Sequence, residues 1–254
     1  MVDCDAFEIL NPDATSSVIV LCDHASRFIP PNIGGKDLGL ALADLERHIA
    51  YDVGALDVAK YIAEHYEATL VFSRFSRLVI DANRGEDDPT LVMRLYDGTI
   101  IPGNRQVNPD AVEQRLQRFH RPYHAAIRQV IDEKLVICPM PILLSIHSFT
   151  PQLRGGGKRP WHIGVLWEGD DTLALPVIQS LRLLVDVCVG DNEPYSGGLP
   201  GDTLNIHGSK RGLPHVLVEF RSDLIEDGAG QCVWAEKIIA ALNAAIATLG
   251  KEKT

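Results

Sequence analysis

The chain has 254 residues, of which 46% are apolar and 23% are charged, so it is long enough and apolar enough to bury one substantial core. This composition excludes disorder as a description of the whole chain. Its 24 basic and 34 acidic residues give a formal net charge of −10, which argues against nucleic acid or an anionic membrane surface as a partner.

Short apolar runs alternate with longer helical patterns along the chain. In chain order these patterns predict a strand at 18–22, a helix around 53–62, strands at 69–72 and 78–80, a long amphipathic helix over 110–134, strands at 141–146, 162–167 and 215–220, and a closing helix over 230–249. Continuously apolar strands separated by helices are typical of the α/β class. We therefore expect a single domain over 1–254, with a mixed, largely parallel sheet flanked by helices.

Four of the apolar runs end in polar residues: Asp23-His24, Asp81 to Arg84, His147-Ser148 and Glu219 to Arg221. In open α/β sheets, ligands bind beyond the carboxyl ends of the strands. Four such endings in one chain predict a single shared site.

His24 and His147 are the two histidines at these strand ends. Two imidazoles, one carboxylate and an open position form a catalytic zinc site, and we favour Asp52 as the carboxylate. Zinc would lower the pKa of a bound water to about 7 and polarise a carbonyl, while Glu219 passes a proton from that water to the leaving amine. The competing interpretation is that these are surface or core histidines, as we expect for three others within helical patterns: His65, His120 and His124.

Arg74, Arg77 and Arg84 crowd one stretch, with Asn83 beside the last. Guanidinium groups bind carboxylates bidentately, and a neighbouring amide adds one more hydrogen bond. In a strand, Arg77 and Asp81 would share one face and pair with each other. Asn83 and Arg84 would then remain free for a substrate.

Two glycine-rich stretches are predicted to be loops. Residues 154–158 superficially resemble a phosphate loop but lack its Lys-Ser/Thr ending, so we interpret them as a flexible loop. The connection over 194–208 has the length of a segment that covers an active site. Within it, Tyr195 and His207 are candidates to contact a tetrahedral intermediate, with placement on the surface as the alternative.

The cysteines and the N-terminal residues predict a cytoplasmic protein. The chain begins without the basic and apolar regions of a secretory signal, and its apolar runs look too short and too interrupted by charge to span a bilayer. The five cysteines form no CxxC pair, which is typical of reduced thiols: Cys4, Cys22, Cys138, Cys188 and Cys232.

Taken together, these residues resemble the N-formylglutamate amidohydrolase family. The matching stretches begin at Asp23, His48, Arg74, Ser145 and Val218, and they cover nearly the whole chain. The string Arg-x-x-x-Asp-x-Asn-Arg over 77–84 is the most specific piece. It also looks like the carboxylate clamp of the wider zinc carboxypeptidase and aspartoacylase group, whose fold this family is thought to share.

The resemblance implies a zinc amidohydrolase that cleaves the amide of a small anionic N-acyl amino acid, nominally N-formylglutamate, to formate and glutamate. It implies that His24 and His147 bind zinc and that Glu219 is the general acid and base. Asn83 and Arg84 would hold the substrate α-carboxylate, and Arg77 would polarise the scissile carbonyl or help to hold a carboxylate.

Several alternatives stay open. Arg27 stands where an HxxE motif would place a glutamate, so Asp57 and Asp23 rival Asp52 as the third metal ligand. The competing functions are a zinc carboxypeptidase-like enzyme or another N-acyl amino acid deacylase, or a non-catalytic carboxylate-binding protein. The sequence does not indicate an oligomeric state.

Overall fold

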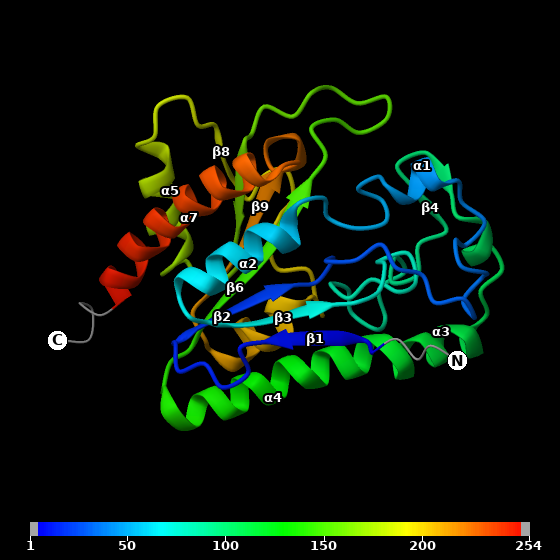
Figure 1. The fold of residues 1–254 in the computed structure, drawn as a ribbon, viewed down its shortest axis with the longest axis horizontal. Coiled ribbons are helices and arrows are strands. Elements are labelled where there is room, and N and C mark those ends of the chain that lie inside the picture. Colours follow the sequence, from blue (N-terminus) through cyan, green and yellow to red (C-terminus); the bar gives the residue numbers. More distant parts are fainter. Residues whose placement is uncertain (1–4, 250–254) are drawn as a thin grey trace.

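The computed structural model describes residues 5–249, and its centre is a seven-stranded sheet (Figure 1). The strand order is β1-β3-β2-β6-β9-β7-β8, in which β3, β2, β6 and β9 run parallel while β1 and β7 run antiparallel to their neighbours β3 and β9. The predicted mixed, largely parallel sheet is therefore confirmed. The strands are β1 (Phe7–Leu10), β2 (Val18–Cys22), β3 (Thr69–Ser73), β6 (Ile142–Phe149), β7 (Ile163–Leu166), β8 (Val189–Asp191) and β9 (His215–Arg221), and a separate hairpin holds β4 (Leu95–Tyr96) and β5 (Thr99–Ile100).

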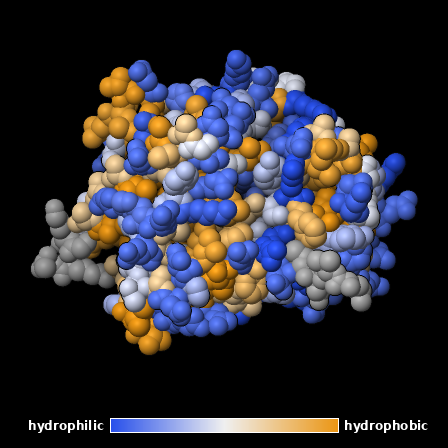
Figure 2. Space-filling model, in the orientation of Figure 1, coloured by the Kyte–Doolittle hydropathy of each residue, from blue (hydrophilic) through white to orange (hydrophobic). Residues whose placement is uncertain are grey.

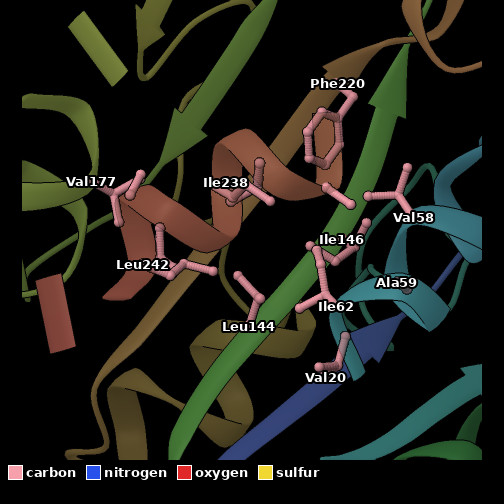
Figure 3. Packing of buried hydrophobic residues seen from close by; sticks show 14 of the residues in the cluster. Val20, Val58, Ala59, Ile62, Leu144, Ile146, Val177, Phe220, Ile238 and Leu242 are labelled. Carbon is pink, nitrogen blue, oxygen red and sulfur yellow. The ribbon is translucent and has the colours of Figure 1, made fainter. Parts of the chain in front are cut away.

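Helices cover both faces of the sheet. On one face, α2, α5 and α7 enclose a core with the alternate residues of the strands, and Figure 3 shows Ile62 of α2 and Ile238 of α7 in one cluster with Ile146 of β6. On the other face, α4 and irregular segments around residues 29–50 and 75–101 enclose a second core. The α-helices are α1 (Leu42–Leu45), α2 (Ala55–His65), α3 (Pro109–Arg115), α4 (Arg121–Ile137), α5 (Ala174–Arg182), α6 (Thr203–His207) and α7 (Gly228–Leu249).

Most of the predicted elements are confirmed, with shifted ends. The predicted helix over 110–134 is α3 and α4, which a π-helical turn at Leu116–His120 joins. The strand predicted at 141–146 continues as β6 through Phe149, so His147 lies within a strand rather than after it. Sequence patterns did not indicate β1, α1, the β4–β5 hairpin, α5, β8 or α6, which are short or only partly buried.

The strand predicted at 78–80 is wrong. Leu78, Val79 and Ile80 are fully buried as expected, but they form a turn and then an irregular segment. Side chains bond their carbonyls in place of a strand partner: Asn104 Nδ2 donates to Leu78 O (2.7 Å) and Arg115 Nη1 donates to Val79 O (2.7 Å). A continuous apolar run thus indicated burial, not an extended backbone.

The apolar helix α7 and the cysteines are the two features that bear on the predicted compartment. Contrary to the sequence analysis, α7 is long and apolar enough to cross a membrane by length and composition, although Trp234, Ile238 and Leu242 pack into the core against the sheet. Four of the cysteines are free thiols, whereas Cys4 lies outside the described residues.

The surface is mixed in character. Hydrophilic residues dominate the face shown in Figure 2, and hydrophobic residues form separate patches among them. One patch, at the upper left, lies over the end of α5, where Leu183 and Val185 are exposed.

Candidate active site

The carboxyl ends of β2, β6 and β9 meet at one edge of the sheet and bring the predicted site residues together. His24 follows β2, while His147 of β6 and Glu219 of β9 are paired in register. The turn before α2 adds Asp52, whose backbone N–H donates to His24 O (2.9 Å). That turn requires Gly54, because its φ is +75° and a Cβ there would collide with the carbonyl of Ile225.

His24, Asp52 and His147 form a compact group of metal-ligand type, and all three are buried. One donor atom from each lies within 4.8 Å of the other two. Asp52 Oδ2 is 2.8 Å from His147 Nδ1 and 3.3 Å from His24 Nδ1, and the two imidazole rings meet edge to face with centroids 4.9 Å apart. The sequence prediction that these three residues converge is confirmed.

The outer nitrogen of each imidazole is held by a further buried carboxylate. His24 Nε2 lies 2.7 Å from Asp81 Oδ1, and His147 Nε2 lies 3.0 Å from Asp23 Oδ2. Tyr123 and Thr203 donate to the other oxygen of Asp23 at 2.9 and 2.8 Å. Metal-binding histidines generally have such partners, which fix the ring orientation and place the proton on the outer nitrogen.

The electrostatics of this group favour a cation between the three residues. When both imidazoles are neutral with the proton on Nε2, the two Nδ1 lone pairs and Asp52 Oδ2 are acceptors that face one another. When the imidazoles are protonated instead, burial would still raise the pKa of Asp52, but their charge and hydrogen bonds hold it well below its usual range. Likewise, the hydrogen bond and charge of His147 lower the pKa of Asp23 to about 2, against the effect of burial. The donor set therefore fits a divalent metal of zinc type.

Glu219 stands beside this group as a buried carboxyl without a hydrogen-bond partner for Oε2 among the described residues. Its side chain lines the same cavity as both histidines. Burial, opposed by the charge of His147, raises the pKa of Glu219 to about 7. A carboxyl in this state can exchange a proton near neutral pH, as the sequence analysis expected of a general acid and base.

Arg77 is engaged by two protein carboxylates. Its Nε and Nη2 donate to Asp81 Oδ2 at 3.1 and 2.8 Å, and its Nη1 donates to Asp52 Oδ1 at 3.2 Å. The predicted pair with Asp81 is therefore confirmed, although it does not lie in a strand. Arg77 lines the cavity and stacks on the ring of Tyr96, 5.3 Å from its centroid.

Asn83 and Arg84 line the cavity as well. Thr203 N donates to Asn83 Oδ1 (3.0 Å), so the Asn83 amide keeps its N–H donors for a ligand. Arg84 donates through Nη1 to Asn83 O (2.7 Å) and through Nε to Thr90 Oγ1 (3.3 Å), and its Nε lies 4.0 Å from Asp88 Oδ2. Among the described residues, Arg84 Nη2 has no partner. Both residues are thus placed where a substrate carboxylate can be bound.

The cavity has a volume of about 430 Å³, and the long connection before β9 forms one of its walls. Tyr195 lies in that wall, where its hydroxyl accepts a hydrogen bond from Arg159 (3.1 Å). Two lining residues that the sequence analysis did not select are His48 and Tyr96. Their rings meet edge to face (5.9 Å), and the only sequence signal was the position of His48 within a family-like stretch.

His207 does not line the cavity. It is buried, stacks on His124 (5.2 Å between centroids), and donates through Nε2 to His124 Nδ1 at 3.0 Å. His124 Nε2 and His120 Nε2 in turn bond the carbonyls of Ala82 and Arg84 at 3.0 and 2.9 Å. The structure therefore places His207 behind Asn83 and Arg84, which line the cavity, and not in the cavity wall where a tetrahedral intermediate could contact it.

The rival metal ligands lie elsewhere. Asp23 supports the outer nitrogen of His147, and Asp57 is exposed on α2, 3.5 Å from Lys60. Arg27, which stands where an HxxE motif would place a glutamate, pairs with exposed Glu46 (3.1 Å). Asp52 is the carboxylate that the structure brings to both imidazoles.

Comparisons with known proteins show the family of this chain. The family model described as N-formylglutamate amidohydrolase matches residues 16–226. An N-formylglutamate deformylase from Pseudomonas putida is 29% identical over 166 residues, which span 57% of this chain and 62% of that relative. A gene product from Agrobacterium tumefaciens of known structure is 32% identical, with 98% of this chain and 97% of that chain covered and a TM-score of 0.92. An N-formylglutamate amidohydrolase from Ralstonia eutropha shares the fold, at 19% identity over 95% of this chain and 97% of that one with a TM-score of 0.73. The chain belongs to the N-formylglutamate amidohydrolase family.

Proposed function

We propose that this protein is a zinc-dependent amidohydrolase that removes the acyl group, in the first place formyl, from a small N-acyl amino acid. The observation that carries the proposal is the buried His24–Asp52–His147 group with the unpartnered carboxyl of Glu219 beside it. Family membership supports the reaction class, and N-formylglutamate, hydrolysed to formate and glutamate, is the reference substrate because relatives carry its name.

His24, Asp52 and His147 are the residues that would hold the ion. A zinc ion bound there supplies a water of lowered pKa and a Lewis acid for the carbonyl oxygen. Glu219 accepts the proton of the attacking water and returns it to the amide nitrogen as the C–N bond breaks. Its Oε2 has no competing partner among the described residues, so it is available for both transfers.

Asn83 and Arg84 bind the α-carboxylate of the substrate in this proposal. The fork of Arg84 matches a carboxylate, and the Asn83 amide is oriented by its bond to Thr203 N. Arg77 holds Asp52 and Asp81 in place, and its contact with the scissile carbonyl stays a prediction.

The test is formate release by the purified protein after removal of its metal and reconstitution with zinc. We expect turnover of N-formyl amino acids that requires about one equivalent of zinc per chain, with free amino acid formed in equal amount. A protein that binds N-formyl amino acids but releases no formate with zinc, manganese or cobalt would be a carboxylate-binding protein instead. Faster cleavage of N-acetyl amino acids or of dipeptides would favour the other two enzyme classes.

A further inference from the structure

We propose that the cavity accepts an apolar amino-acid side chain, so that N-formyl amino acids with a single carboxylate and an apolar side chain bind better than N-formylglutamate. This inference rests on the proposed function, because it uses the Arg84 carboxylate site and the position of Glu219. It goes beyond that function by naming the class of side chain.

The floor of the cavity next to Glu219 is made of leucines. Residues alternate along β9, so Leu217 is on the same face as Glu219, about 7 Å along the strand. Leu166 of β7 is paired in register with Leu217, and Leu204 of α6 completes the floor. All three leucines line the cavity, and each is more than nine-tenths buried.

This floor lies next to the amino-acid part of the expected substrate, not next to its acyl group. Leu204 directly follows Thr203, whose N–H holds the side chain of Asn83. A substrate whose α-carboxylate meets Asn83 and Arg84 therefore has its Cα near α6. Its side chain then extends into the cavity that Leu204 and Leu217 line.

A second carboxylate would find no cation in this part of the cavity. Among the described residues that line it, the Arg and Lys residues are Arg77 and Arg84. Arg77 is bonded to Asp52 and Asp81, and Arg84 is assigned to the α-carboxylate. Two further acidic side chains, Glu168 and Asp202, also line the cavity. Burial of an unpaired carboxylate among such groups is costly.

His215 and Ser209, at the far end of the floor, offer no free hydrogen-bond donor to a second carboxylate. His215 Nδ1 donates to Leu213 O (2.8 Å), so its Nε2 is an acceptor, and Ser209 Oγ donates to that Nε2 (3.1 Å). The donors of both side chains are therefore used within the protein. A γ-carboxylate of glutamate would have to break these bonds to gain one.

The first experiment measures binding without turnover. Isothermal titration calorimetry on zinc-loaded Glu219→Gln compares N-formyl-L-leucine, N-formyl-L-methionine, N-formyl-L-glutamine and N-formyl-L-glutamate. We expect the Kd for leucine and methionine to be at least about tenfold lower than for glutamate, with glutamine between them. Equal or tighter binding of glutamate overturns the inference. Tighter binding of leucine by a protein whose wild type cleaves none of these compounds would support the side-chain inference and contradict the proposed hydrolysis.

The second experiment adds a cation to the floor. Leu217→Lys should lower the Kd for N-formylglutamate by about tenfold or more, because the new ammonium pairs with the γ-carboxylate. It should raise the Kd for N-formylleucine by about tenfold or more, because a charge replaces part of the apolar floor. Leu217→Met keeps an apolar side chain of similar volume and should retain the wild-type preference. Leu204→Lys tests the same point from α6 if Leu217→Lys does not fold. An unchanged ratio of the two Kd values in a folded lysine variant overturns the inference.

Discussion

His147 and Glu219 occupy paired positions on the adjacent parallel strands β6 and β9. Neighbouring strands lie about 4.8 Å apart, so this register alone places the buried carboxyl next to a ring of the metal-type group. Both strands are central in the sheet, and the backbone here is enclosed by packed layers. The distance between the proposed base and the proposed metal site is thus fixed by the sheet rather than by a mobile loop.

This relationship predicts that Glu219→Gln separates catalysis from metal binding. Glutamine keeps the shape of the side chain but cannot accept a proton, so kcat should fall by about 10²–10⁴-fold. Zinc content, measured by elemental analysis, should stay at the wild-type value. Glu236→Gln on the exposed face of α7 is the matched control and should leave both quantities unchanged. Loss of zinc from Glu219→Gln would identify Glu219 as a ligand.

The same variant should also reveal the raised pKa of Glu219 in the metal-free protein. The pKa lies near 7 in the folded state and near 4.5 when unperturbed, so the folded state keeps its proton over this range while the unfolded state loses it. Stability due to Glu219 is therefore lost as the pH rises from about 4.5 to about 7. The free energy of unfolding of Glu219→Gln, relative to the wild type, should rise across this window by on the order of 3 kcal/mol. Urea titrations at a series of pH values measure this difference, and a flat difference would contradict it.

The assignment of Asp52 as the third ligand can be tested against its two rivals, Asp57 and Asp23. Asp52→Asn should lose zinc, whereas Asp57→Asn, on the exposed side of α2, should bind zinc as the wild type does. Asp23→Asn should weaken zinc binding by about 10–100-fold, because Asp23 only orients His147. Competition with a chromogenic chelator gives the three affinities. Retention of wild-type affinity by Asp52→Asn would exclude it as a ligand.

Arg84→Lys should impair use of substrates that carry an α-carboxylate. A lysine ammonium cannot replace two parallel N–H donors, so kcat/KM should fall by about 10–100-fold, chiefly through KM. The matched control is a substrate rather than a variant: an N-formyl amino acid amide, which lacks the carboxylate. Wild type and Arg84→Lys should cleave that amide equally slowly. An equal loss for acid and amide would mean that Arg84 acts on folding rather than on the carboxylate.

Several parts of this site were predictable from the sequence for a physical reason. Polar residues at the carboxyl ends of buried parallel strands must reach the same edge of the sheet, so His24, His147 and Glu219 could be placed together before any coordinates. The same reasoning did not reveal why Asp81 and Asp23 matter, because their bonds to the outer nitrogens depend on ring orientation. It also misassigned His207, since a histidine in a loop and a histidine in a buried stack have the same local sequence. The segment at 78–80 failed because side chains, not a strand, bond its carbonyls.

The buried histidine stack predicts a distinct acid sensitivity. Burial lowers the pKa of His124 to about 3, with the charges of its neighbours adding to the effect, and burial lowers that of His207 to about 4. The unfolded chain binds these protons near pH 6.5, so stability from both residues is present above that pH and is lost as the pH falls toward 4.

His124→Gln isolates this effect. Glutamine has an N–H donor for Ala82 O and an acceptor for His207, but it does not titrate. Between pH 6 and pH 4 the free energy of unfolding of His124→Gln should fall less steeply than that of the wild type, by up to about 1.4 kcal/mol per pH unit. His65→Gln, at the exposed end of α2, should keep the wild-type slope. A slope for His124→Gln equal to that of the wild type would mean that the stack already carries a proton in the folded protein. In that case the carbonyls of Ala82 and Arg84, and with them the carboxylate site, would be held by a charged rather than a neutral imidazole pair.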